Sequence, residues 1–249
     1  MKTTVALLLS IAIFISCSPI KQKVEQSSTI IDSTLQIKVD SILQNRLSEL
    51  DATAGQIIVM EVQTGEIKAS AGTELKPQES GLIRTASLLA ALETKTVQLS
   101  DTIDVNNGIL VIGKDTLLDH NWYKGGYGKI TIQQGFGVSS NIANYKTAQH
   151  TFKDAQTFSK VLAKYGYQVK DTSLIYNPLG YGVFTTPLQN LTFYNAIAQG
   201  TIGDKAAVNN IKRALEYTVT DGLANPAMSD EVKIAEQQEQ YNFQMVNMQ

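Results

Sequence analysis

The sequence is poor in the residues that build metal centres and covalent cross-links. Its 249 residues include one cysteine, Cys17, and two histidines, His120 and His150. A disulfide within the chain is therefore excluded, and a metal site made of histidine and cysteine ligands is nearly excluded. We expect neither a metal nor any other cofactor.

An excess of charge of one sign is also lacking. The chain has 21 Lys and Arg against 23 Asp and Glu, so its net charge is only −2 and no basic surface for nucleic acid is indicated. Hydrophobic residues make up 43% and charged residues 18%, which is ordinary for a folded globular protein and too apolar for a disordered one. The length suits one large domain or two small ones.

Long apolar runs are missing, and the one near the N-terminus is short. It covers residues 5–15, whereas a helix that crosses a bilayer needs about 20 apolar residues. Together with Lys2 it fits an export signal. The following FISC, residues 14–17, resembles a bacterial lipobox, in which cleavage leaves the cysteine as a lipid-modified N-terminus. The alternative is a plain signal peptide with an incidental cysteine.

This N-terminal pattern predicts where the protein resides. We expect residues 1–16 to be a lipoprotein signal peptide and residues 17–30, which are polar, to be a tether. Lipidated Cys17 would then hold the protein on a membrane of the cell envelope, facing the periplasm.

The remainder, residues 31–249, is expected to form one domain of the α+β class. Periodic apolar residues predict helices, whereas β-branched and alternating stretches predict strands. The expected helices cover 31–50, 83–96, 131–150 with a break at 138–141, 154–165, 186–198 and 208–219. The expected strands are a hairpin over 56–62 and 66–70, and two short runs at 232–235 and 241–248, while the middle of the chain is expected to be rich in loops.

Several segments, in order, resemble the transpeptidase domain of class B penicillin-binding proteins, the D,D-transpeptidases that cross-link peptidoglycan. They are QIIVMEVQTGEIKASAG from Gln56, RTASLLAALE from Arg84, DTIDVNNGILVIGKDTLLDHNWYKGGYGKITIQQGFGVSSNIAN from Asp101, LGYGVFTTPLQNLTFYNAIAQG from Leu179 and ALEYTVTDG from Ala214. The resemblance implies a transpeptidase/β-lactamase-like fold, an antiparallel sheet with packed helices. Family members have further strands and a closing helix after their third motif, so we expect a truncated domain with an incomplete sheet, whose edges either close in a reduced form or are covered by a partner.

The family's first motif, Ser-x-x-Lys, is altered here. A serine nucleophile and a lysine base three residues later share one face of a helix. Alignment on the helix places Gly81 at the serine and Arg84 at the lysine. Glycine has no hydroxyl, and a guanidinium does not deprotonate at ordinary pH. Ser80 is the nearest hydroxyl, but Ile83 lies three residues after it, so we interpret Ser80 as a helix N-cap.

Of the other two motifs of the family, one is retained and one is lost. Ser-x-Asn is retained as Ser139-Ser140-Asn141; in the family its serine shuttles a proton and its asparagine holds the substrate amide. Alternatively, these residues only cap a helix. Lys-Thr-Gly, which binds the substrate carboxylate, falls on Gln237, Gln238 and Glu239, where the cation is lost.

Two functions follow. The first is a non-catalytic lipoprotein that binds or scaffolds in the envelope; the second is an active transpeptidase or β-lactam sensor with unconventional residues. Loss of two motifs of three favours the first. We expect a groove that is lined by Ser80, Arg84, Ser139 and Asn141. It would either recognise a peptidoglycan stem peptide through its carboxylate or be filled by neighbouring side chains, and envelope proteins are the other possible partners.

Overall fold

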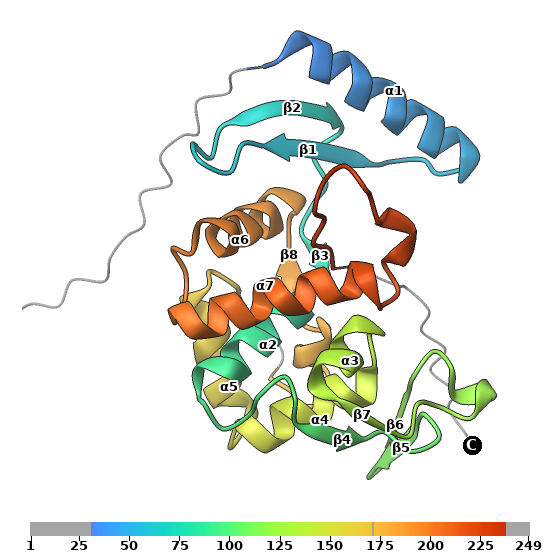
Figure 1. Ribbon diagram of the computed structural model, residues 1–249, viewed down its shortest axis with the longest axis vertical. Helices are drawn as coiled ribbons and strands as arrows, with labels where there is room; N and C mark the ends of the chain where they lie inside the picture. Colours follow the sequence, from blue (N-terminus) through green and yellow to red (C-terminus); the bar gives the residue numbers. More distant parts are fainter. Residues whose placement is uncertain (1–30, 171, 238–249) are drawn as a thin grey trace, which may run out of the picture.

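The computed structural model describes residues 31–170 and 172–237. The predicted signal peptide, the tether with Cys17, the run at 241–248 and residues Gln238 and Glu239 lie outside these residues. Figure 1 shows two layers: a helix over a β-hairpin, and below them a bundle of helices with short strands at its lower end. No helix in the described ranges has the length and apolar character needed to cross a membrane.

The first layer consists of helix α1 (Ser33–Glu49), β1 (Gln56–Met60) and β2 (Ile67–Gly72). Helix α1 begins after Asp32, whose carboxylate accepts the backbone N–H groups of Thr34 and Leu35, both at 2.9 Å. The strands pair antiparallel, as predicted, and α1 packs on their face. A small cluster of buried residues joins the helix to the hairpin: Val39, Ala69 and Ala71.

Helix α1 also covers the outer edge of β2. The Gln36 side chain donates to the carbonyl of Ser70 at 2.9 Å and accepts its N–H at 3.0 Å. One turn earlier, the backbone N–H of Asp32 donates to the carbonyl of Lys68 at 2.9 Å. Among the described residues the hairpin is a two-stranded sheet, and α1 protects one of its edges.

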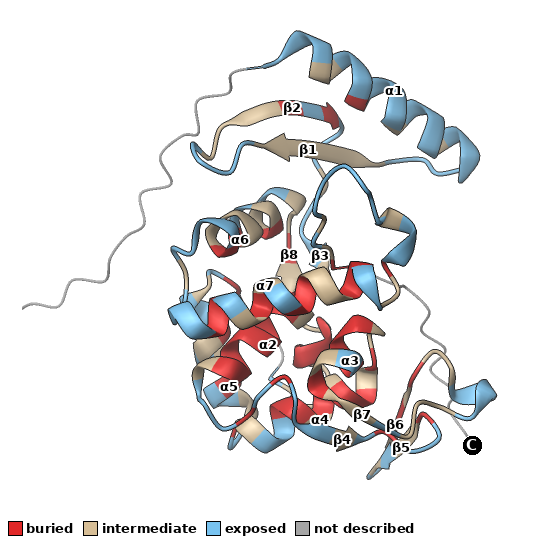
Figure 2. Cartoon of the chain, viewed as in Figure 1, coloured by how far each residue is buried: buried red, intermediate tan, exposed pale blue. Residues whose placement is uncertain are grey.

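The second layer is built around α2 (Ile83–Glu93), whose residues from Thr85 to Leu92 are all buried. Figure 2 shows the buried residues gathered in this helical layer, whereas α1 is largely exposed. The helices that surround α2 are α3 (Ile132–Gly137), α4 (Asn141–Thr151), α5 (Ala155–Lys164), α6 (Pro187–Gln199) and α7 (Lys205–Thr220). All of them were predicted, with ends within a few residues. The apolar periodicity of these segments therefore located the core helices correctly.

The short strands of this layer form three further two-stranded antiparallel sheets. These pair β3 (Gln78–Glu79) with β8 (Phe184–Thr185), β4 (Thr102–Asp104) with β7 (Lys129–Thr131), and β5 (Ile109–Ile112) with β6 (Asp115–Leu118). Three single-turn helices complete the described residues: η1 (Trp122–Lys124), η2 (Asn177–Leu179) and η3 (Asn225–Ala227). The middle of the chain, which the turn residues predict to be rich in loops, thus contains short paired strands.

The strand expected at 232–235 is wrong. This stretch has no strand partner and follows α7 instead: the N–H of Glu236 donates to the carbonyl of Leu215 at 3.1 Å, and the Thr218 hydroxyl donates to the carbonyl of Glu236. These contacts with α7 hold the segment, and it forms no strand among the described residues.

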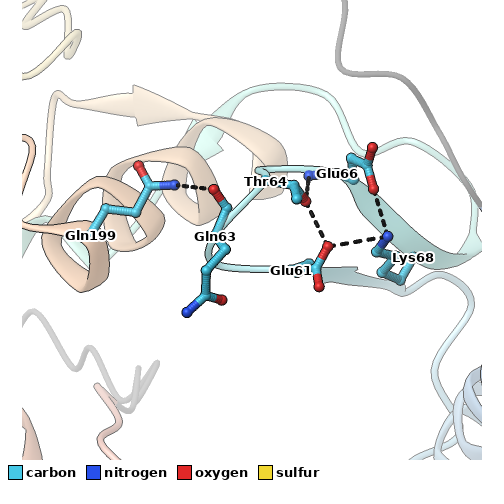
Figure 3. Close-up of polar contacts among 6 residues, drawn as sticks. All are labelled: Glu61, Gln63, Thr64, Glu66, Lys68 and Gln199. Atoms are coloured by element: carbon cyan, nitrogen blue, oxygen red, sulfur yellow. Dashed lines mark hydrogen bonds and ion pairs between the residues drawn. The ribbon is translucent and has the colours of Figure 1, made fainter.

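The two layers meet where the β1–β2 turn touches the C-terminal end of α6. The Gln199 amide donates to the backbone carbonyls of Val62 and Gln63, the latter at 3.5 Å (Figure 3). Next to this contact, the Lys68 ammonium lies 3.2 Å from the Glu61 carboxylate and 2.6 Å from that of Glu66. The turn of the hairpin is therefore fixed to the helical layer through its backbone carbonyls.

Candidate functional site

The turn before α2 holds the residues that align with the family's nucleophile. Ser80 is buried, and its hydroxyl accepts the N–H of Leu82 at 3.3 Å. The helix itself starts later, with Leu82 at its N-cap and no capping side chain. Ser80 is therefore not the N-cap, which corrects the sequence interpretation. The reason is a separate turn over Gly81, in which the N–H of Ile83 bonds to the carbonyl of Ser80.

This turn packs against the loop that follows η2. Gly180 has a φ of +105°, and a Cβ at this position would lie 2.1 Å from the backbone oxygen of Ser80. Only glycine permits both the left-handed backbone and this close approach. The backbone of Ser80 and Gly81 is therefore held by a neighbouring chain segment.

Arg84 lies in the first turn of α2 and reaches the retained second motif. Its guanidinium donates to the Asn141 side-chain oxygen at 2.5 Å. The Asn141 amide nitrogen in turn donates to the carbonyl of Leu118 at 2.7 Å. Both ends of the Asn141 amide are thus bonded within the protein, one of them by a charge-assisted hydrogen bond.

A buried carboxylate that the sequence analysis missed holds this motif in place. Asp119 is fully buried, and it accepts the Ser140 hydroxyl at 2.8 Å and the N–H of Ile142 at 3.1 Å. Ser140 is the N-cap of α4 and also accepts the N–H of Ala143 at 3.0 Å. Burial raises the pKa of Asp119 above its ordinary value of 3.8, and the hydrogen bonds from Ile142 and Ser140 oppose this rise. A carboxylate at a helix N-terminus also interacts favourably with the helix dipole.

Ser139 is the link to the third motif. It adopts a left-handed backbone conformation with a φ of +50°, which is uncommon for a residue other than glycine. The side-chain amide of Gln237 lies 3.5 Å from the Ser139 hydroxyl, and Gln237 is buried. The structure therefore places the Gln237 position next to the second motif, although the two are 98 residues apart in the sequence.

The side chains that line this site are mainly amides and hydroxyls. Contacts connect Arg84 to Asn141 and Ser139 to Gln237, and Ser80 lies on the turn that precedes Arg84. Among residues 31–170 and 172–237, no group of three or more His, Cys, Asp or Glu side chains could hold a metal ion. The expected groove is thus occupied in part by hydrogen bonds among its own residues.

Comparisons with known proteins identify the family and the fold. Residues 55–244 match the family model of the penicillin-binding protein transpeptidase domain. The fold is similar to that of the transpeptidase domain of Burkholderia pseudomallei penicillin-binding protein 3 in its apo form, with a TM-score of 0.73, 18% identity, and coverage of 82% of this chain and 74% of that one. A peptidoglycan glycosyltransferase from Burkholderia ambifaria gives a TM-score of 0.71 at 18% identity, over 82% and 78% of the two chains. No protein with a curated description matches in sequence.

The matched segment covers most of the chain, so the family is shown. The family match and the fold define a transpeptidase-like domain. This chain belongs to the penicillin-binding protein transpeptidase family, as its sequence segments predicted.

Proposed function

We propose that the protein is a lipid-anchored component of the cell envelope whose transpeptidase domain binds or scaffolds without catalysing cross-linking. The observation that carries this proposal is at the start of α2. Alignment on the helix puts Gly81 at the family's nucleophile and Arg84 at its base, and the Arg84 guanidinium bonds to Asn141. Acylation needs an activated hydroxyl, a base and an oxyanion hole together.

The surroundings of Arg84 support the proposal. A guanidinium stays protonated at all ordinary pH values, so it cannot accept a proton from a neighbouring serine. Ser80 is buried and accepts a backbone N–H through its hydroxyl oxygen. Asn141, the residue that would hold a substrate amide, has its own amide bonded to Arg84 and Leu118.

Labelling with a fluorescent penicillin tests the absence of catalysis. We expect no covalent label on the full chain, because no activated hydroxyl faces the site. Gly81→Ser combined with Arg84→Lys restores the spacing of the first motif and serves as the matched variant. Stoichiometric label on the wild type that is lost in Ser80→Ala or Ser139→Ala would show an active enzyme or β-lactam sensor instead.

The anchor is tested separately, because it does not depend on the site. Cys17→Ala expressed in a Gram-negative host is expected to release the protein from the membrane fraction. A variant that fractionates with membranes like the wild type would place the anchor elsewhere.

The partner is proposed to be an envelope protein in preference to a stem peptide in the groove, since hydrogen bonds within the protein already engage Asn141 and Ser139. Titration with a stem peptide, followed through Trp122 fluorescence, distinguishes the two. A saturable change that Arg84→Ala abolishes would assign the peptide to the groove.

A further inference from the structure

A hollow lies along the C-terminal half of α4, away from the family motifs. Its volume is about 640 Å³, within the range of about 300–1,000 Å³ that is usual for small-molecule sites. Residues of helix α4 and strand β4 line it. These two elements are in contact and lie at the lower end of the molecule in Figure 1. Its lining includes Val97, Asp101, Ile103, Asp104, Ile132 and Lys146.

The backbone fixes the walls of this hollow. Strand β4 pairs with β7, and the N–H of Ile132 donates to the carbonyl of Asp101 at 2.8 Å. Val97, Ile132 and Thr147 are buried and form an apolar base with one hydroxyl. The Thr147 hydroxyl donates to the carbonyl of Ala143 at 2.8 Å, so it turns toward its own helix. The base is therefore a preformed, mostly apolar surface.

The rim carries both signs of charge, and these charges do not neutralise one another. The Lys146 ammonium donates to the backbone carbonyl of Asp104 at 2.6 Å, which leaves two of its three N–H groups for another acceptor. Asp101 and Asp104 each accept one local backbone N–H, from Gln98 and Asn106. None of the ion pairs recorded among the described residues includes Lys146, Asp101 or Asp104.

We propose that this hollow binds a small zwitterion with an apolar body, such as an amino acid or a short peptide with free termini. Its carboxylate would accept hydrogen bonds from Lys146, and its ammonium group would lie near the carboxylates of Asp101 and Asp104. The apolar body would cover Val97, Ile103 and Ile132.

Nuclear magnetic resonance titration of the full chain in detergent tests the proposal, with alanyl-leucine as the probe. We expect saturable shifts of the backbone signals of Ile103 and Lys146. N-acetyl-alanyl-leucine, which lacks the ammonium group, and alanyl-leucinamide, which lacks the carboxylate, are each expected to bind at least about tenfold more weakly, the loss expected for one charged hydrogen-bonded group.

Variants assign the two charges. Lys146→Met is expected to weaken the binding of alanyl-leucine about tenfold and to leave the binding of alanyl-leucinamide unchanged. The double variant Asp101→Asn with Asp104→Asn is expected to weaken the binding of alanyl-leucine and to leave that of N-acetyl-alanyl-leucine unchanged. Lys160→Met, an exposed lysine on α5, is the control and should change nothing. The proposal is overturned by the absence of saturable shifts, or by an affinity for alanyl-leucine that Lys146→Met leaves unchanged. Shifts at Asn141 that Arg84→Ala removes would also overturn it, because they place the dipeptide in the motif groove.

Discussion

Helix α4 has polar side chains at both ends, and the two ends use them differently. At the N-terminal end, Ser140 and Asn141 are bonded to Asp119, Arg84 and Leu118 within the protein. In the C-terminal half, the Lys146 ammonium uses one N–H group for the carbonyl of Asp104, and Lys146 lines a hollow. The first end carries a family motif, whereas the second carries the Lys146 ammonium, which has N–H groups left for another acceptor. Inheritance of a motif and availability for binding are therefore separate properties of this helix.

The largest expected effect is at Asp119. Asp119→Ala removes the acceptor of the Ser140 hydroxyl and of the Ile142 N–H. Both donors are buried and lose this hydrogen bond. We expect the free energy of unfolding to fall by about 3 kcal/mol, as measured by urea denaturation. Asp230→Ala, an exposed aspartate, is the control, with a change of less than about 0.5 kcal/mol. A similarly small change for Asp119→Ala would remove the contrast between the two ends.

An intermediate effect is expected from pH. Because burial raises the pKa of Asp119, the folded protein binds this proton more tightly than the unfolded chain. The resulting stability is fully present below the unfolded pKa and is lost as the pH rises through the raised folded pKa.

The advantage of the wild type over Asp119→Asn in unfolding free energy is thus expected to shrink with rising pH, by about 1.4 kcal/mol per unit of pKa shift. Urea denaturation at a series of pH values from about 3 upward measures it. The opposite slope would mean that the hydrogen bonds from Ser140 and Ile142 outweigh the cost of burial.

The smallest expected effect is at the other end of the helix. Lys146→Met removes one solvent-exposed hydrogen bond to the carbonyl of Asp104 and no recorded ion pair. The free energy of unfolding should therefore change by less than about 0.5 kcal/mol, compared with Lys160→Met by the same urea denaturation. A loss of several times this amount would show that Lys146 stabilises the fold, as Asp119 is expected to do at the other end of α4.

The sequence predicted the helices well, because their periodic apolar residues report directly on burial. It also predicted that Arg84 and Asn141 lie close together, and the structure joins them by a hydrogen bond. It did not predict β4 to β7, since strands of three or four residues have too few side chains for an alternating pattern.

Asp119 was missed for a different reason. Its partners Ser140 and Ile142 lie 21 and 23 residues away, so its role depends on tertiary contacts that local patterning does not contain. The one available indication is a single acidic residue directly after the apolar pair Leu117-Leu118. The hollow beside α4 gave no indication either, because its residues come from three separate segments of the chain.

The Gln36 side chain has a consequence for self-association. Its amide offers Ser70 the same donor and acceptor that a peptide group of a third strand would offer. A strand from another molecule can pair with this edge only after α1 has moved away, so aggregation through β2 is coupled to local unfolding of one helix. The rate of such aggregation should then follow the population of molecules with α1 detached and should rise under mild denaturing conditions that leave α2 folded.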